Sequence, residues 1–280
     1  MTEKQLWQRF KRRPSAVAGL CFLGLLLFVA LTADLWLPRE WVIGQNSEER
    51  LLGPSAAHFF GTDETGRDLF WRVVYGTRSS LLIGVLATLI GLLAGVPLGL
   101  LAGYFGGWAE QLIMRVTDVF SALPSMLTAM AVVAVLGASF VNLVLAVGIA
   151  SVPLFVRVSR AAAMEKAQEG YVDAARTLGA GPGFILFRHI LPGILPQILV
   201  HVTLRIGSAI IAAAGLSFLG LGIGAPDPEW GALLAAGRNF IRTDGHLCFF
   251  PGLAVTLTVL ASCMVSDGLR DALDPHTYDT

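Results

Sequence analysis

Long apolar runs alternate with shorter polar segments along this chain, and the alternation predicts its architecture. A helix that crosses a bilayer needs about 20 predominantly apolar residues. Six runs approach or exceed that length, and they are residues 16–33, 80–102, 119–136, 141–158, 194–221 and 249–265. The pattern therefore predicts an all-α integral membrane protein with six transmembrane helices.

The first run separates a short basic tail, residues 1–15, from a membrane domain, residues 16–280. A basic tail before an apolar run is also typical of a signal peptide. However, the run at 16–33 is longer than the roughly 7 to 15 residues of a signal core, and further apolar runs follow it. We therefore expect an uncleaved first transmembrane helix.

Lys and Arg residues predict the orientation, because they concentrate in the cytoplasmic segments of membrane proteins. With the tail inside, the following residues are also placed inside: Arg115, Arg157, Arg160, Lys166, Arg176, Arg188 and Arg270. Both termini are then cytoplasmic. Residues 35–77 and 225–248 become external loops, and residues 161–193 become a cytoplasmic loop.

Composition agrees with a membrane protein and restricts its chemistry. Hydrophobic residues make up 55% of the chain, charged residues 14%, and the mean hydropathy is +0.68, which is far from a soluble domain. The net charge of zero gives no indication of a nucleic-acid partner. The sequence has no P-loop, HExxH, CxxC or GxSxG motif, and its histidines are scattered. We therefore expect no catalytic site, no metal site and no cofactor bound by this chain.

The segment 165–196 is the one polar, helix-forming insert of its length between strongly apolar runs. Good helix formers precede Gly179, which stands where a helix takes a left-handed C-cap, and Pro182 suits the first turn of a second helix. Pro192 and Pro196 then predict a change of direction before the next apolar run. We expect two short helices in a bent hairpin that does not span the membrane.

Small and charged side chains make the first of these helices a candidate contact surface. Ala174 and Ala175 lack bulk, which lets the helix lie close to a partner, and Asp173 and Arg176 at its rim offer polar contacts. The same pattern fits an ordinary amphipathic surface helix. Periodicity alone leaves both interpretations open.

Polar side chains in the fifth run raise the question of a translocation path. His201, Arg205 and Ser208 lie within or near the hydrocarbon, where a central Arg costs about 2.5 to 3.5 kcal/mol on insertion scales and normally faces protein or water. If the helix begins early, the two basic residues lie only about two to three turns from its cytoplasmic end, and snorkelling suffices. Pathway lining and snorkelling are the two alternatives.

A second patterned stretch lies in the first external loop. Its members are Gly61, Thr62, Asp63, Gly66, Arg67 and Asp68. The carboxylates suggest a cation site, but their spacing lacks the ligand ladder and distal Glu of an EF-hand loop. Hydrogen bonds between Asp and Arg side chains in a glycine-turned loop account for the same residues, and we favour this interpretation.

The cytoplasmic insert resembles the EAA loop of permease subunits of bacterial ABC importers. The resemblance is carried by Asp173, Ala174, Ala175, Gly179, Leu191 and Pro192. Asp173 replaces the usual Glu, and His189 stands where the pattern often has Ile. The strings GTDETGRD and GLSFLGLG and the tail GLRDALDPH resemble the dipeptide, oligopeptide and nickel branch, in particular its second, C-type permease.

This resemblance implies a type I ABC importer permease fold with a cytoplasmic coupling helix at residues 173–179. It implies four kinds of partner: a homologous second permease subunit, one or two cytoplasmic ATP-binding subunits that hold ATP and Mg, an external solute-binding protein, and the lipid of a bacterial inner membrane. The chain would form half of a pathway for di- or oligopeptides. The alternatives are the same role for nickel or a metal chelate and, from other classes, a stand-alone secondary transporter or a structural membrane subunit.

Overall fold

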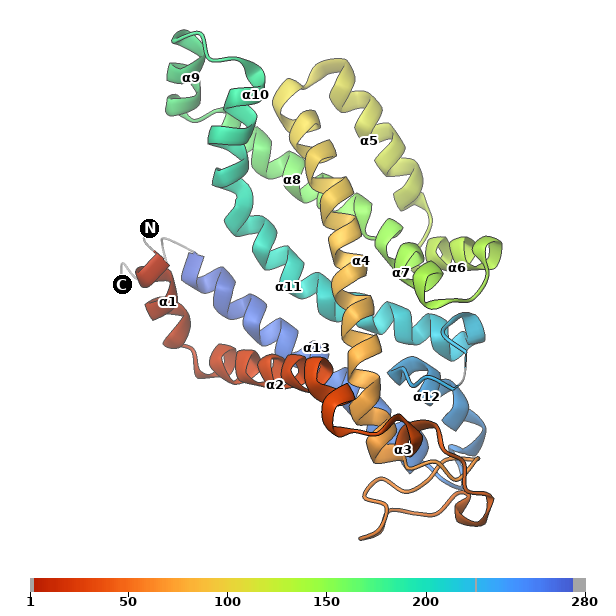
Figure 1. Cartoon of the computed structure of the whole chain (residues 1–280). Helices are drawn as coiled ribbons and strands as arrows, with labels where there is room; N and C mark the ends of the chain where they lie inside the picture. The colour runs from red at the N-terminus through yellow and green to blue at the C-terminus, as the bar shows by residue number, and fades with distance from the viewer. Residues whose placement is uncertain (1–2, 225, 274–280) are drawn as a thin grey trace.

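The computed structural model describes residues 3–224 and 226–273, which form the helical assembly of Figure 1. Its helices are α1 Glu3–Lys11, α2 Pro14–Trp36, α3 Arg39–Ile43, α4 Leu69–Phe105, α5 Gly107–Ala122, α6 Ser125–Leu136, α7 Phe140–Ile149, α8 Val152–Ala167, α9 Gly170–Thr177, α10 Pro182–Ile185, α11 Leu191–Leu216, α12 Trp230–Gly237 and α13 His246–Leu273. Short 3₁₀ turns occur at Ser47–Glu49 and Arg238–Phe240, and π-helical turns at Leu186–Ile190 and Ser217–Leu221. Within the described ranges, β-structure is limited to one isolated bridge between Thr62 and Asp68.

The predicted all-α membrane fold is confirmed. Among the described residues, five helices or helix pairs are long and apolar enough to cross a membrane, and a sixth crossing results if α5 and α6 form one span. The five are Pro14–Trp36, Leu69–Phe105, Phe140–Ala167, Pro182–Leu221 and His246–Leu273. The expected count of six therefore depends on a broken third span.

Helix α4 begins earlier than the apolar run indicated, because Asp68 caps it. The Asp68 carboxylate accepts a hydrogen bond from the amide of Trp71 at 3.2 Å. With 37 residues, α4 is about 55 Å long, whereas the hydrocarbon core is about 30 Å thick. Residues 69–77 of the expected external loop are thus helical, and α4 is long enough to extend beyond the bilayer.

The third span is not the single helix expected at 119–136. α5 and α6 meet at an angle of 85°. Leu123 is extended, with φ −95° and ψ 139°, because the residue before a proline is disfavoured in the helical region. Pro124 then precedes the first turn of α6.

The change of direction expected at Pro192 and Pro196 is wrong, since the chain continues from α10 into α11. The π-turn at Leu186–Ile190 joins them, and the amide of Leu191 bonds to the carbonyl of Leu186. Pro192 lies in the first turn of α11, directly after the π-turn, and Pro196 lies further inside the helix. The wider π-turn is the kind of local adjustment that accommodates proline in a long helix.

A stripe of glycines on α4 brings it against α8. Gly91, Gly95, Gly99 and Gly103 recur every four residues, so they share one face of the helix. A Cβ added at Gly95 would lie 2.6 Å from the Phe155 Cβ and 2.8 Å from the Val152 carbonyl oxygen. Such small residues let two helix backbones approach closely in a membrane.

The two ends of the molecule carry different elements. In Figure 1, α9 and α10 lie towards the upper left, α1 and the end of α13 lie towards the left, and α3, α12 and the loop before α4 lie towards the lower right. α1 packs on the end of α13: Phe10 and Ala16 are buried against it, and Arg13 forms an ion pair with Asp271. α1 and the end of α13 therefore lie towards the same end of the molecule as α9.

Gly95→Ala tests the close approach of α4 and α8. We expect a destabilisation of about 1–3 kcal/mol, because the new methyl group must displace a backbone carbonyl, and a lower unfolding temperature in detergent. Gly24→Ala is the matched control, since a Cβ at Gly24 meets nothing within 4 Å and Ala is favoured over Gly in a helix. Equal behaviour of the two variants would contradict the packing argument.

Candidate functional site

Local chemistry at both ends of α9 shapes the loop that the sequence predicts to be cytoplasmic. Before the helix, Lys166 forms an ion pair with Glu169. After it, Gly179 takes a φ of 82°, and the amides of Gly179 and Ala180 bond to the carbonyls of Arg176 at 2.9 Å and Ala175 at 3.0 Å. These two bonds form a Schellman cap. The expected helix, left-handed glycine and following Pro182 helix are confirmed.

One face of α9 is anchored to the transmembrane core. Val172 is fully buried and Ala175 is half-buried in an apolar cluster that includes Leu100 of α4 and Ile185 of α10. Polar contacts also hold the helix: Arg176 pairs with Asp173 at 3.1 Å, and its guanidinium lies 5.3 Å from the centre of the Tyr104 ring at the end of α4. α9 is thus attached directly to α4 as well as to α8.

The opposite face of α9 and the turn after it are exposed. Ala174 is exposed, and three large apolar side chains near it are 87% (Leu178), 58% (Phe184) and 72% (Phe187) accessible. Ala174 and Leu178 belong to α9 and its C-cap, whereas Phe184 and Phe187 lie in α10 and the π-turn that begin the next long helix. Exposed apolar side chains are typical of interaction sites, so this surface is a candidate docking face.

The remaining loop residues join α9 to α11. Leu191 is half-buried in the same cluster as Val172, whereas Pro192 is exposed on the first turn of α11. The His189 ring lies 5.9 Å from the Tyr171 ring and 5.5 Å from the Phe184 ring. His189, which stands where the family pattern often has Ile, therefore packs against two aromatic side chains.

A cavity of about 630 Å³ lies between the C-terminal parts of α8 and α13 and the N-terminal half of α11. Its polar lining consists of Glu165, Gln197, His201, Ser266, Asp267 and Arg270. Arg205 and Ser208 lie elsewhere: the Arg205 Nε donates to the Ser151 Oγ at 2.8 Å, and one of its Nη atoms lies 3.5 Å from the Ser208 Oγ. The structure thus separates His201 from the other two candidate path residues.

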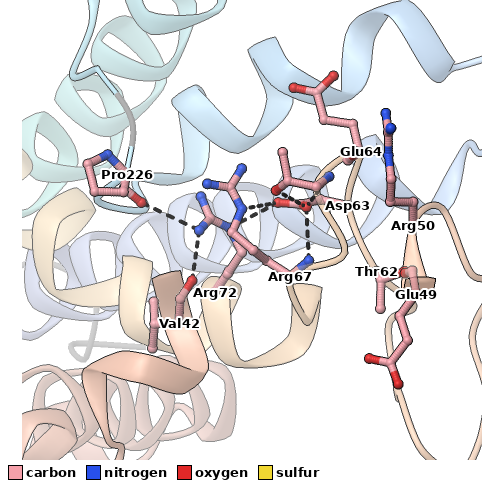
Figure 2. Close-up of polar contacts among 10 residues, drawn as sticks. Val42, Glu49, Arg50, Thr62, Asp63, Glu64, Arg67, Arg72 and Pro226 are labelled. Carbon is pink, nitrogen blue, oxygen red and sulfur yellow. Dashed lines mark hydrogen bonds and ion pairs between the residues drawn. The ribbon is translucent and has the colours of Figure 1, made fainter. Parts of the chain in front are cut away.

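The external motif folds around one carboxylate (Figure 2). One oxygen of Asp63 accepts from the hydroxyl and amide of Thr65 at 2.7 and 2.8 Å and from the Arg67 amide at 3.0 Å, and the other accepts from the Arg67 Nε at 2.6 Å. Gly61 and Gly66 take φ values of 79° and 77° in the surrounding turns. Asp63 therefore holds the loop by hydrogen bonds, as the loop interpretation predicts.

Arg72 extends this cluster to other parts of the chain. Its Nη1 donates to the carbonyls of Val42 at 2.8 Å and Pro226 at 3.4 Å, and its Nε lies 3.6 Å from an Asp63 oxygen. All three charged side chains of the cluster, Asp63, Arg67 and Arg72, are at least nine-tenths buried. The cluster therefore joins the motif, the segment before it and the loop after α11.

Two further residues of the motif close the external loop. Thr62 donates its hydroxyl to the carbonyl of Glu49 and accepts from the amide of Leu52 at 2.8 Å. Asp68 binds the Nδ1 of His58 at 2.8 Å in addition to capping α4. Every polar residue of the motif thus has a structural partner.

The environment lowers the pKa of Asp63. Burial alone would raise it, but hydrogen bonds from Thr65 and from the Arg67 amide, together with the Arg67 charge, outweigh burial and hold the pKa below its ordinary value of 3.8. The charged form of Asp63 is therefore part of the folded state.

The comparisons with known proteins decide the family. A model described as binding-protein-dependent transport system inner membrane component matches residues 95–278. The chain belongs to this family of permeases. A second model, described as the N-terminal TM domain of oligopeptide transport permease C, matches residues 4–54. The chain is a transport component of an ABC importer and not an enzyme.

Relatives of this permease cover nearly its whole length. It is 46% identical over 272 residues to the glutathione transport system permease protein GsiD of Pectobacterium atrosepticum, with 97% of this chain and 90% of that protein aligned. It is 43% identical over 272 residues to the dipeptide transport system permease protein DppC of Alkalihalophilus pseudofirmus, with 97% and 89% aligned. Among solved structures, the inward-facing MetNI methionine ABC transporter matches with a TM-score of 0.61 at 17% identity, covering 74% of this chain and 98% of that one. This likeness confirms the type I importer permease fold.

Two contact residues of the permease escaped the sequence analysis. Arg72 was placed in an external loop, although an arginine in the first turns of an apolar helix is itself a signal that the group has a buried partner. Tyr104 directly follows the apolar run at 80–102, and such an aromatic residue is by sequence typical of the membrane interface. Its contact with Arg176 joins residues far apart in the chain, and no local pattern indicates it.

Asp63→Asn tests the external cluster of the permease. We expect a loss of about 3–5 kcal/mol at neutral pH, because two buried arginines lose their carboxylate. The stability that comes from the lowered pKa is complete above about pH 3.8 and is lost as the pH falls through the folded pKa. Thermal unfolding at a series of pH values should show this acid-dependent part in the native chain and not in Asp63→Asn. Glu64→Gln, a change in the neighbouring carboxylate, should keep it; its loss there would contradict the assignment.

Tyr104→Leu tests the contact that holds α9 against α4. A cation–π contact at an exposed site contributes about 0.5–1 kcal/mol, so exchange of the α9 amides should accelerate roughly two- to fivefold. Tyr104→Phe keeps the ring face and should leave exchange unchanged, as should Phe105→Leu at the next residue. Hydrogen exchange of residues 170–177 measures the effect, and acceleration in Tyr104→Phe would show that the hydroxyl matters instead.

Proposed function

We propose that this permease forms half of the translocation pathway of an ATP-driven importer of short peptides, and that α9 is its coupling helix. Permeases of this family work with a binding protein, a partner permease and ATPase subunits. In the proposed arrangement α9 docks on one or two cytoplasmic ATPase subunits, which hold ATP and Mg. The solute-binding protein delivers substrate on the opposite side, and both termini of the permease lie in the cytoplasm.

The orientation of α9 is the observation that carries the docking part of this proposal. Val172 and Ala175 face the core while Ala174 and Leu178 face away from it. Because one face of the helix is packed against the protein and the other is exposed, a displacement caused by a partner on the exposed face is transmitted to the elements that contact the packed face. These elements are α8, which leads into α9, and α4, whose Tyr104 contacts Arg176. Conformational change driven by ATP then requires only that the ATPase binds α9 differently in its two states.

The names of the relatives support a peptide substrate. One relative carries glutathione, a tripeptide, in its name and another carries dipeptide. This favours a short peptide over nickel or a metal chelate. Membership of a binding-protein-dependent family argues against a stand-alone secondary transporter and a structural subunit. His201 on the wall of the inner cavity is the candidate path residue that this proposal retains, because the cavity is open to solvent and partly polar.

Ala174→Leu tests the docking face. We expect the variant to insert and fold as the native chain does. It should retain at least about tenfold less ATPase subunit on copurification, equivalent to about 1.4 kcal/mol, because the larger side chain keeps the two surfaces apart at the centre of the contact. The measurement is affinity purification in mild detergent, with the bound subunits identified by mass and assayed for ATP hydrolysis.

Two controls sharpen this experiment. Ala18→Leu changes an equally exposed alanine on α2 and should leave ATPase binding intact. Gly179→Ala changes the backbone cap instead of the docking face, because no side chain is favoured at a φ of 82°. A native chain that copurifies with no ATPase, or an Ala174→Leu variant that binds it normally, contradicts the proposal.

A further inference from the structure

The short helix α1 lies beside the start of α2 and the end of α13 (Figure 1). One of its faces is packed on the protein: Phe10 is buried in a cluster with Ala16 and Ala272, and Leu6 is half-buried against the same cluster. The Phe10 ring fits against Gly268, where an added Cβ would lie 3.2 Å from the Phe10 Cε2. α1 is therefore held as a fixed part of the surface of the permease.

The other face of α1 and the residues that follow it are exposed and basic. Lys11, Arg12 and Arg13 are all exposed. Trp7 is 47% exposed and stacks on Phe10, with the ring centres 5.8 Å apart. The Lys11 Nζ lies 5.0 Å from the centre of the Trp7 ring. An exposed tryptophan beside several cations is typical of a surface that contacts lipid headgroups.

The length of α2 places this surface at the edge of the membrane. α2 has 23 residues and is about 35 Å long, close to the hydrocarbon thickness of about 30 Å. Residues 14–33 include no charged side chain, and Trp36 at the far end of α2 suits the opposite headgroup layer. Residues 11–13 directly precede Pro14. Because each headgroup layer is about 5 to 8 Å deep, these three basic residues lie within it or directly at it.

The charge around α1 favours an anionic ligand. Among the described residues of α1, of the turn after it and of the last turns of α13, six are basic and three are acidic. They are Lys4, Arg9, Lys11, Arg12, Arg13 and Arg270, and Glu3, Asp267 and Asp271. Arg13 forms an ion pair with Asp271, and the surface still keeps an excess of positive charge. Each basic residue near a membrane surface raises the affinity for anionic lipid roughly fivefold.

We propose that this exposed face of α1 binds the headgroup of an anionic phospholipid. The lipid phosphate accepts hydrogen bonds from Lys11 and from the guanidinium groups that follow it, and the Trp7 ring lies beside the glycerol and ester groups. The acyl chains lie along exposed apolar side chains of α2, which are Leu20, Leu25, Leu27, Phe28 and Leu31. A zwitterionic lipid gains less from this surface, because its own cation offsets the phosphate charge. The inference concerns the membrane around the permease and holds for any transported solute.

Quenching of Trp7 by brominated lipid tests the proposal. The full-length chain is reconstituted in phosphatidylcholine vesicles that contain an increasing fraction of lipid with brominated acyl chains, either phosphatidylglycerol or phosphatidylcholine. The difference between the native chain and Trp7→Phe isolates the Trp7 fluorescence from that of the other five tryptophans. We expect half-maximal quenching of Trp7 at a mole fraction of brominated phosphatidylglycerol at least about tenfold lower than that of brominated phosphatidylcholine. High salt should reduce this preference, because it screens exposed charges.

Matched variants assign the preference to the basic face of α1. Lys11→Gln combined with Arg12→Gln removes two charges and should lower the preference for phosphatidylglycerol at least about tenfold. Lys11→Arg combined with Arg12→Lys keeps both charges and should keep the preference. Arg242→Gln removes an exposed cation at the other end of the molecule and should leave the quenching of Trp7 unchanged.

Three results would overturn the proposal. One is equal quenching of Trp7 by the two lipids, or an unchanged preference in the Gln double variant. The second is displacement of brominated phosphatidylglycerol by millimolar glycerol phosphate, which would indicate a site for soluble phosphate compounds instead of lipid. The third is absence of a lipid preference together with loss of a copurifying protein in the Gln double variant, which would assign this face of α1 to a protein partner.

Discussion

The close contact between α4 and α8 determines how the two ends of this permease can act on each other. Four glycines on one face of α4 let the α8 backbone approach so closely that an added Cβ would clash with it. In a membrane, where lipid is as apolar as the helix surface, such packing holds helices together without a hydrophobic driving force. α8 continues into the loop that carries α9. A displacement of α9 therefore reaches α4 as a movement of the pair.

Contacts at both ends of α4 complete this rigid unit. At its C-terminal end, Tyr104 lies against Arg176 of α9. At its N-terminal end, Arg72 donates to the carbonyls of Val42 and Pro226 and lies beside Asp63. A buried ionic cluster adds little net stability, because desolvation offsets attraction. Its effect here is geometric, since it fixes three separate segments of the chain around the outer end of one helix.

The sequence predicted most of the fold because hydropathy and capping act locally. Apolar runs located the spans, and Gly179 and Pro182 predicted the ends of α9 and α10 from their own backbone preferences. The continuous path through Pro192 was mispredicted, since a π-turn removes the conflict that a proline creates in a regular α-helix. The 85° bend at Leu123 also depends on tertiary structure, because a proline in a span often produces only a kink. For the candidate site, Asp173 to Gly179 followed from a motif, whereas the contacts of Tyr104 and Arg205 depend on distant segments.

Rigid and broken spans have complementary roles in a transporter. Alternating access needs two packings that differ by only a few kcal/mol, and well-packed interfaces shift between discrete arrangements instead of deforming gradually. The α4–α8 pair has the stiffness to carry motion from α9. Among the described residues, the amide of Leu123 at the break between α5 and α6 has no backbone acceptor, so the break changes angle at little cost in backbone bonding. Movement that enters through the stiff pair is therefore expected to appear at the break, where Asp118 and Arg157 join α5 to α8.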